Sequence, residues 1–266
     1  QLNQVETNIV KNLNKDGIAF SNVDDLLGKN SSFTELNSVV NNILENRKEE
    51  FAQLKVRAND ENTIGNKTFN LELLGSELTF DTDNIFARFA LNESLLNIAN
   101  TYFQMYAKLR YYNVWKTFAS NGSPRESQLW HFDREDRYIL KVFLYLSDVD
   151  EGAGPFTYAP ETHKKGKLSN LEPKYFIEGG VHRTTDEQMN EVFPKDKWVK
   201  GTGKKGTIIF ADTRGFHKGG EARTNDRLMF TCMFTSPASE SKQLIKYPSN
   251  LNLKTLTRKQ IKALNF

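Results

Sequence analysis

Apolar residues in the first third of the chain recur every three or four positions, the spacing of amphipathic helices. Ser31 or Ser32 is expected to cap the longest of these helices, because a serine hydroxyl accepts a hydrogen bond from a free backbone N–H there. Asn-rich links are predicted to be turns at 59–66 and 81–84. The predicted elements are helices over 5–14, 33–54 and 94–105 and a strand over 17–23.

From about Lys108 onward the pattern changes to short β-prone runs separated by turn residues. Helices gathered in the first part and strands in the second predict a mainly β fold with flanking α-helices, a sandwich or barrel backed by helices. We expect one domain over 1–266, with a mostly helical flank at 1–107, a strand-rich core at 108–236 and a C-terminal tail at 237–266. The predicted strands of the core are 109–118, 128–133, 138–146, 154–158, 206–211 and 227–235.

A polar segment at 161–203, called the insert below, interrupts the predicted core strands. It contains one predicted helix, at 185–192. Long excursions of this kind between core strands often form a lid or a binding loop, so this is the expected role of the insert.

Composition and charge exclude several classes of protein. With 12% aromatic residues the chain is expected to fold, and its net charge of +3 comes without the basic stripe of a nucleic-acid binder. The single Cys232 excludes an internal disulfide and fits a reducing compartment. There is no run of 18 apolar residues and no signal-peptide pattern, so we expect a cytoplasmic protein without a membrane partner. Because the sequence begins at Gln1 rather than Met, it leaves open whether a leader was removed.

Candidate metal chemistry lies in the pair His131-x-Asp133 and in the distant His217. Side chains alternate along an extended segment, so His131 and Asp133 point to the same face. A second imidazole would complete two histidines and one carboxylate, a set that suits Fe(II) and leaves positions open for other ligands. A His-x-Asp pair alone also occurs by chance at strand ends. The surrounding segments therefore decide whether the pair indicates a metal site.

Those segments are the apolar run 138–146, the turn DVDEGAGPF with YAPETH after it, and Arg227 ten positions beyond His217. In this order they resemble the phytanoyl-CoA dioxygenase-like family of Fe(II)/2-oxoglutarate-dependent oxygenases. The resemblance implies a double-stranded β-helix (jelly-roll) core, with His131, Asp133 and His217 as iron ligands. It also implies that Arg227 holds the distal carboxylate of 2-oxoglutarate, and that O2 is consumed while a small molecule is hydroxylated and succinate and CO2 are released.

Further residues are candidates for binding. Lys141 is expected to contact 2-oxoglutarate or an anionic substrate, or else to hold its amine in water at an edge. Thr157 is either a co-substrate contact or an ordinary strand residue. Gln128 and Arg137 are candidate substrate contacts.

Two other histidines are not expected to be iron ligands. The family commonly has Pro-Gly-Ser-His where this chain has Pro-Glu-Thr-His, so His163 is expected to be structural. His182, inside the insert, is expected to be an exposed loop residue.

Three functions stay open on the sequence. The first is a 2-oxoglutarate-dependent hydroxylase of a small, polar or anionic molecule, and Asp133 favours it over halogenation because halogenating relatives lack this carboxylate. The second is a cupin-like jelly-roll metalloenzyme that does not use 2-oxoglutarate. The third is a non-catalytic jelly-roll binding module. Neither the substrate nor the oligomeric state follows from the sequence.

Overall fold

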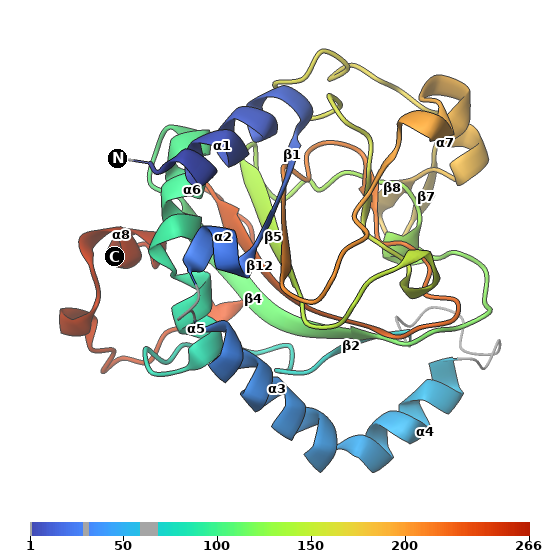
Figure 1. The fold of residues 1–266 in the computed structure, drawn as a ribbon. Helices are drawn as coiled ribbons and strands as arrows, with labels where there is room; N and C mark the ends of the chain where they lie inside the picture. Colours follow the sequence, from blue (N-terminus) through green and yellow to red (C-terminus); the bar gives the residue numbers. More distant parts are fainter. Residues whose placement is uncertain (1, 29–31, 59–68) are drawn as a thin grey trace.

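The computed structural model describes residues 2–28, 32–58 and 69–266, and its centre is an antiparallel six-stranded sheet (Figure 1). A smaller three-stranded sheet, in the order β11-β6-β9, forms the second layer of the jelly roll. The large sheet has the order β1 (Ile18–Asn22), β10 (Thr207–Ala211), β5 (Ile139–Tyr145), β12 (Arg227–Thr235), β4 (Lys108–Thr117) and β2 (Asn70–Glu72). The small sheet consists of β6 (Thr157–Tyr158), β9 (Val199–Lys200) and β11 (His217–Lys218).

Helices cover one face of the large sheet (Figure 1). The first of them begins with a capping box, in which the Asn3 side chain accepts from the backbone N–H of Glu6 and Glu6 accepts from that of Asn3. The α-helices in the described residues are α1 (Gln4–Asp16), α2 (Val23–Leu27), α3 (Phe33–Asn46), α4 (Lys48–Ala58), α5 (Ile85–Ala90), α6 (Glu93–Phe103), α7 (Asp186–Val192) and α8 (Arg258–Ala263), of which α7 lies apart from this layer, in the insert. None of the helices in the described residues is long and apolar enough to cross a bilayer.

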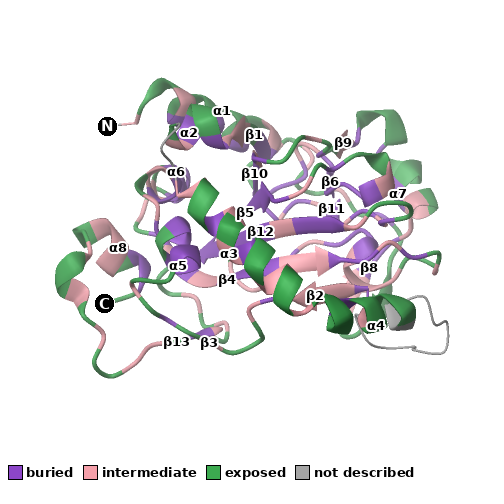
Figure 2. Ribbon diagram, turned by 60° about the horizontal axis from the view of Figure 1, so that its bottom comes forward, coloured by how far each residue is buried: buried purple, intermediate pink, exposed green. Residues whose placement is uncertain are grey.

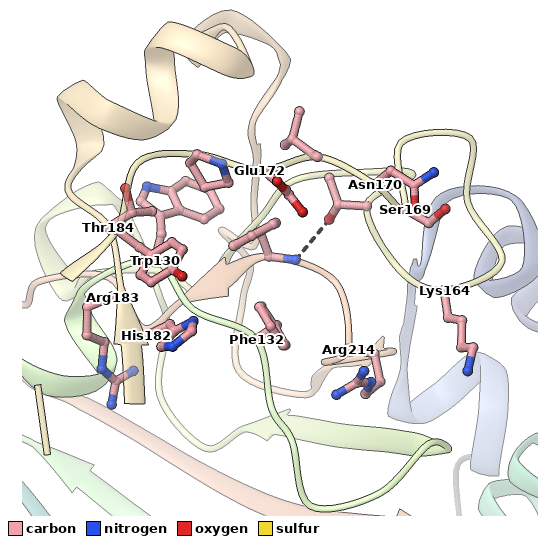
Figure 3. Close-up of a pocket in the computed structure, with 15 residues that line it drawn as sticks. Trp130, Phe132, Lys164, Ser169, Asn170, Glu172, His182, Arg183, Thr184 and Arg214 are labelled. Atoms are coloured by element: carbon pink, nitrogen blue, oxygen red, sulfur yellow. Dashed lines mark hydrogen bonds between the residues drawn. The ribbon is translucent and has the colours of Figure 1, made fainter. Parts of the chain in front are cut away.

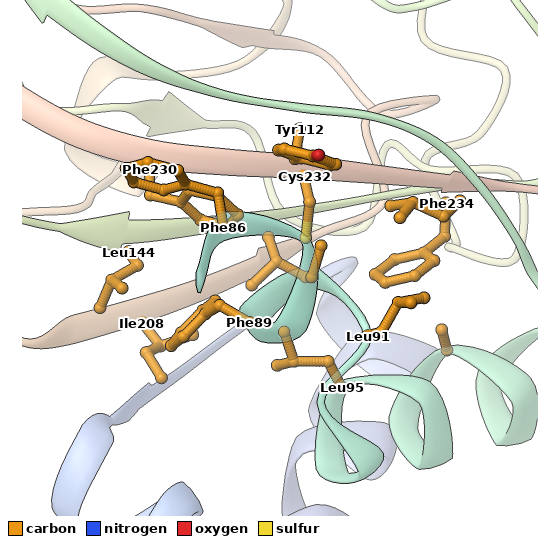
Figure 4. Packing of buried hydrophobic residues seen from close by; sticks show 14 of the residues in the cluster. Phe86, Phe89, Leu91, Leu95, Tyr112, Leu144, Ile208, Phe230, Cys232 and Phe234 are labelled. Atoms are coloured by element: carbon orange, nitrogen blue, oxygen red, sulfur yellow. The ribbon is translucent and has the colours of Figure 1, made fainter. Parts of the chain in front are cut away.

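The main hydrophobic core lies between this helical layer and the large sheet (Figure 4). Phe230 of β12 packs edge-to-face against Phe89 of α5, with ring centroids 5.2 Å apart. Alternation along β12 sends Leu228, Phe230 and the following even-numbered residues into this core. The odd-numbered residues therefore face the interior of the jelly roll, where the site lies.

The helical arm formed by α3 and α4 is more exposed to solvent than the two sheets (Figure 2). The strands are largely buried, whereas most of α4 is exposed. The single helix predicted over 33–54 is wrong: it divides at Arg47, whose φ of −115° is not helical. Ser32 occupies the N-cap position of α3 without a side-chain hydrogen bond, and Ser31 lies outside the described residues.

Several predicted elements are confirmed within a residue or two, among them α1, β1, α6, β4, β5, β10 and β12. The turn at 81–84 is also present, and Asn84 caps the short helix α5 by accepting from the N–H groups of Phe86 and Ala87. The sequence did not predict α5. The turn expected at 59–66 lies outside the described residues.

The segment predicted as a strand at 128–133 is not a regular strand. A 3₁₀ turn, Glu126–Gln128, precedes it, and isolated antiparallel bridges then join Trp130 to Thr184 and His131 to His217. These bridges hold the segment between β8 and β11 without continuous pairing.

The insert is more structured than its composition indicated. The predicted helix is confirmed as α7, with Thr185 in a capping box. The hairpin of β7 (Phe176–Glu178) and β8 (Val181–Arg183) precedes it, and β9 follows. Strands of two or three residues are too short to produce a readable alternation. The remaining pair is β3 (Leu78–Thr79) with β13 (Ile245–Lys246).

Candidate metal centre

The bridged segment brings the three predicted ligands together. His131 and His217 exchange backbone hydrogen bonds of 3.0 and 2.9 Å, so their side chains leave on the same side. Two positions on, the Asp133 N–H donates to the carbonyl of Thr213 at 2.8 Å, which fixes the carboxylate on that side as well. The ligand atoms of all three residues lie within 4.8 Å of one another. They form the one such His/Cys/Asp/Glu group in the described part of the chain.

Backbone carbonyls orient both imidazoles. Nδ1 of His131 lies 2.8 Å from the carbonyl oxygen of Leu129, and Nδ1 of His217 lies 3.0 Å from that of Gly215. Since a carbonyl can only accept, each Nδ1 carries the proton and each Nε2 keeps its lone pair. Nε2 of His217 lies 3.9 Å from Oδ1 of Asp133. The lone pairs and the carboxylate therefore converge on one point.

Burial keeps the donors in the form that a metal requires. It lowers the pKa of His217 to about 4 and that of His131 well below its usual value. Burial alone would raise the pKa of Asp133, but the positive charge of Lys141 holds it well below the usual range. At neutral pH both imidazoles are thus neutral, with a free lone pair on Nε2, and the carboxyl of Asp133 is ionised, as metal binding demands.

A cavity of about 190 Å³ opens beside the ligands and contains Arg227 at the start of β12. Arg227 is 5% exposed, and in the part of the chain that the structure describes its Nη atoms have only long contacts of 3.4–3.5 Å, to the carbonyls of Ala153 and Gly220 and to Oγ1 of Thr117. Its Nε has no hydrogen-bond partner among the described residues. A buried guanidinium in this state is costly unless an anion joins it.

The residues present fit an iron ion and a 2-oxo acid. Two imidazole nitrogens and one carboxylate on one face are the donor set of Fe(II) sites with open positions. The cavity next to them ends in a cation whose fork matches a carboxylate. Its lining consists of Phe69, Asn70, Tyr111, Trp115, Ser127, Gln128, His131, Lys141, Phe143, Phe156, His217, Gly219, Gly220, Arg227, Met229 and Thr231.

The other candidate binding residues lie in different places. Lys141 and Gln128 line this cavity, and the Lys141 ammonium lies 2.6 Å from Oδ2 of Asp133. The hydroxyl of Thr157 donates to the carbonyl of Pro155, and the residue is not part of the cavity lining. Arg137 is exposed and borders a separate cavity beside Tyr102 and Phe103.

The two remaining histidines lie outside the ligand group. His163 is fully buried, beside the tight approach of Gly17 to Tyr158. A Cβ on Gly17, whose φ is +78°, would lie 2.7 Å from Nδ1 of His163. His182 is partly buried on β8, with its ring stacked on Tyr175 at 4.1 Å between centroids.

Two aromatic residues of the cavity were not singled out from the sequence. Tyr111 and Trp115 lie on β4, four positions apart and on the same face of the strand. Alternation could have assigned them to the interior, because Tyr112 and Val114 between them belong to the main core.

A second and larger cavity, of about 630 Å³, lies on the other side of the ligand segment (Figure 3). Trp130 and Phe132, which alternate with His131 and Asp133, form part of its wall. The insert supplies much of the rest, including Glu172 and His182. The two cavities share no lining residue.

The sequence model of the family described as phytanoyl-CoA dioxygenase (PhyH) matches residues 81–229, more than half of the chain and all three ligand positions. The chain belongs to this family. It is therefore an Fe(II)/2-oxoglutarate-dependent oxygenase, and its cofactors are those expected from the sequence. No curated protein sequence matches it significantly.

Solved structures of PhyH-type oxygenases share the fold, which confirms the predicted jelly-roll architecture. EctD from S. alaskensis with 2-oxoglutarate and 5-hydroxyectoine aligns with a TM-score of 0.56 at 14% identity, covering 97% of this chain and 86% of that one. The epimerase SnoN in complex with Fe³⁺, alpha ketoglutarate and nogalamycin RO aligns with a TM-score of 0.54 at 15% identity, covering 92% and 87%. Identities this low establish the fold and leave the substrate open.

Proposed function

We propose that this PhyH-family protein hydroxylates a small, polar or anionic molecule and releases succinate and CO2. The observation that carries the proposal is that one cavity combines the ligand group with a buried Arg227 whose Nε has no hydrogen-bond partner among the described residues. A cupin-like enzyme that does not use a 2-oxo acid has no need of this arginine, and a lapsed binding module would have no need of three oriented donors.

Each residue has a proposed task. Nε2 of His131, Nε2 of His217 and one oxygen of Asp133 hold Fe(II), and Arg227 holds the distal carboxylate of 2-oxoglutarate. Lys141 holds the second oxygen of Asp133 and leaves Oδ1 for the metal. When bound, iron and 2-oxoglutarate supply the oxidising chemistry.

Aromatic residues around the cavity exclude water from the reacting groups. Phe143 and Phe156 pack with their rings tilted and their centroids 4.6 Å apart, and the centroid of Phe156 also lies 5.5 Å from that of His217. Trp115 and Tyr111 close the side formed by β4. Exclusion of water strengthens the grip of Arg227 on a carboxylate, because charges interact more strongly in a low dielectric.

The test is the formation of succinate from 2-oxoglutarate with Fe(II) and ascorbate. We expect His131→Ala, Asp133→Ala and His217→Ala to abolish it while the fold is retained, and His182→Ala, in the other cavity, to retain it. Succinate formation by Asp133→Ala at the wild-type rate would reject the assignment.

A second assay separates hydroxylation from other outcomes on the same fold. The neighbours include an epimerase and the carbocyclase SnoK, the latter at a TM-score of 0.52. Incubation with a mixture of small polar acids under ¹⁸O2 should give a product that has gained one labelled oxygen atom. A product with the same mass as its substrate would show that the reaction is an isomerisation and not a hydroxylation.

A further inference from the structure

Arg183 of the insert lies directly across from one of the ligand histidines. Trp130 and Thr184 exchange two backbone hydrogen bonds of 3.0 Å in an antiparallel bridge. The next pair in this register is His131 with Arg183, and opposed residues of an antiparallel pair project to the same side, with Cβ atoms about 5 Å apart. Across the segment His131 is bridged to His217, so Arg183, His131 and His217 form one row.

Alternation along β8 separates Arg183 from its neighbours. His182 and Thr184 face the larger cavity, where the Thr184 hydroxyl donates to the carbonyl of Lys174. Arg183 borders that cavity, but its guanidinium points away from Trp130 and Glu172 (Figure 3). The register opposite His131 places the Arg183 side chain on the metal side of the ligand segment.

The guanidinium of Arg183 is buried and only partly satisfied. The side chain is 5% exposed, and its closest acidic contact is a long one, 3.5 Å from Nη2 to Oε2 of Glu126. Nε and Nη1 are buried and have no hydrogen-bond partner among the described residues. Two free donors on a buried cation are unfavourable unless an acceptor joins them.

Glu126 is a weak competitor for these donors. It belongs to the 3₁₀ turn that precedes the ligand segment, and its φ of +53° is unusual for a residue with a side chain. Its carboxylate is partly exposed, at 26%, and touches a single nitrogen of the fork. A carboxylate or phosphate that reached Nε and Nη1 together would make the bidentate contact that Glu126 does not.

Arg183 is also distinct from the arginine assigned to the co-substrate. Arg227 enters from β12 in the large sheet, whereas Arg183 enters from the insert, beyond His131. With 2-oxoglutarate held by iron and Arg227, neither of its carboxylates is left for Arg183.

We propose that Arg183 binds an anionic group, a carboxylate or phosphate, of the substrate and so selects acidic small molecules for oxidation at the metal. This inference rests on the proposed function and narrows its substrate class. It also assigns a role to the insert in substrate selection, because the hairpin of β7 and β8 positions the Arg183 guanidinium on the metal side.

The experiment uses acetate and inorganic phosphate as probes, titrated by calorimetry under anaerobic conditions into protein saturated with Fe(II) and 2-oxoglutarate. Saturation removes Arg227 as a binding site. The wild type should bind at least one probe, and Arg183→Gln should weaken that binding about 10-fold or more, as expected for a lost charge-assisted hydrogen bond. Arg183→Lys, which keeps the charge without the fork, should lie between them. The preferred probe distinguishes a carboxylate substrate from a phosphate one.

Two matched variants separate anion binding from a structural ion pair. Glu126→Gln removes the competing carboxylate and should tighten probe binding several-fold. Arg134→Gln removes an exposed arginine close to His182 and should change nothing. A wild type that binds neither probe, or Arg183→Gln binding like the wild type, rejects the inference. Weakening by Glu126→Gln equal to that of Arg183→Gln rejects it in favour of a structural pair.

The same preparations report on the proposed function. Succinate formation from 2-oxoglutarate should persist in the wild type and in Arg134→Gln, with the same half-saturating 2-oxoglutarate concentration, and far-UV circular dichroism checks that Arg183→Gln is folded. Equal probe binding by Arg183→Gln and a wild type that forms succinate would overturn the role of Arg183 alone. Lack of succinate in every preparation would overturn the proposed function.

Discussion

The ammonium of Lys141 lies 2.6 Å from Oδ2 of Asp133, so a partly buried lysine neutralises the ligand carboxylate before any metal arrives. Burial works against both charges, yet each partner holds the other ionised: the pKa of Asp133 is lowered and that of Lys141 is raised. The lysine thus has two effects. It makes a buried carboxylate tolerable in the metal-free protein, and it directs Oδ1 towards His217.

Replacement of Lys141 by Met should destabilise the metal-free protein by about 3 kcal/mol, because one partner of a buried pair is left uncompensated. Metal restores a positive charge beside Asp133, so the rise in Tm on adding Fe(II) should be larger in Lys141→Met than in the wild type. Thermal unfolding with and without metal, in the absence of oxygen, measures both.

The control for this prediction is Lys218→Met. Lys218 is also buried and ion-paired, 2.6 Å from Asp186, but its partner is not a metal ligand. This variant should lose stability without a larger response to metal. Equal metal responses in the two variants would contradict the role given to Lys141.

Removal of the Arg227 fork should act on 2-oxoglutarate and leave iron binding intact. Loss of a charge-assisted contact is worth about 1.5–3 kcal/mol, so Arg227→Met should raise the half-saturating 2-oxoglutarate concentration by roughly 10- to 150-fold. Arg227→Lys should recover part of the loss, since it keeps the charge but not the planar fork. Steady-state succinate formation measures the shift, and an unchanged requirement in Arg227→Met would reject the role.

Acid should destabilise the metal-free protein in a range set by the histidines. The pKa of His217 is about 4 in the folded state, lowered by burial from 6.5, so between these values the unfolded chain takes up a proton that the folded one does not. Above pH 6.5 this group therefore does not reduce the free energy of unfolding. As the pH drops below that value, the free energy of unfolding falls, by about 3 kcal/mol at pH 4. His131, whose pKa is also lowered, adds to the loss in the same direction.

Denaturant unfolding of the metal-free protein at a series of pH values checks this slope. His217→Gln cannot take up the proton in either state and should show a shallower dependence on pH. A wild type whose stability is flat between pH 6.5 and 4 would show that the imidazoles are not held neutral by burial.

The elements predicted best from the sequence are the long strands, whose residues form a clear local pattern. β12 begins at Arg227 and ends at Thr235 as expected, because nine mostly apolar and β-prone residues with turn residues before them predict a strand. On β5 the residues alternate: Lys141 and Phe143 line the metal cavity, whereas Val142 and Leu144 belong to the main core. The convergence of His131, Asp133 and His217 depended on motif order rather than on periodicity.

Features that depend on long-range contacts could not be predicted from the sequence. The break at Arg47 falls inside a stretch whose apolar period continues through it. The ligand segment pairs with β8 and β11 through single bridges, which no local pattern encodes. Arg183 is the clearest case: in sequence it is one charge in a polar segment, and only its register opposite His131 gives it a place beside the metal.

The two faces of β12 offer a last test, because Phe230 and Met229 are neighbours in sequence but face different layers. Phe230→Ala empties space within the ring cluster of Phe86, Phe89 and Tyr112 and should cost about 3–5 kcal/mol of unfolding free energy. Met229 is only partly buried and lines the metal cavity, so Met229→Ala should cost about 1 kcal/mol or less, while it changes succinate formation through a wider cavity. Chemical denaturation and turnover, measured on both variants, should thus rank them in opposite orders. Equal stability losses would mean that the strand does not divide the core from the site as the alternation requires.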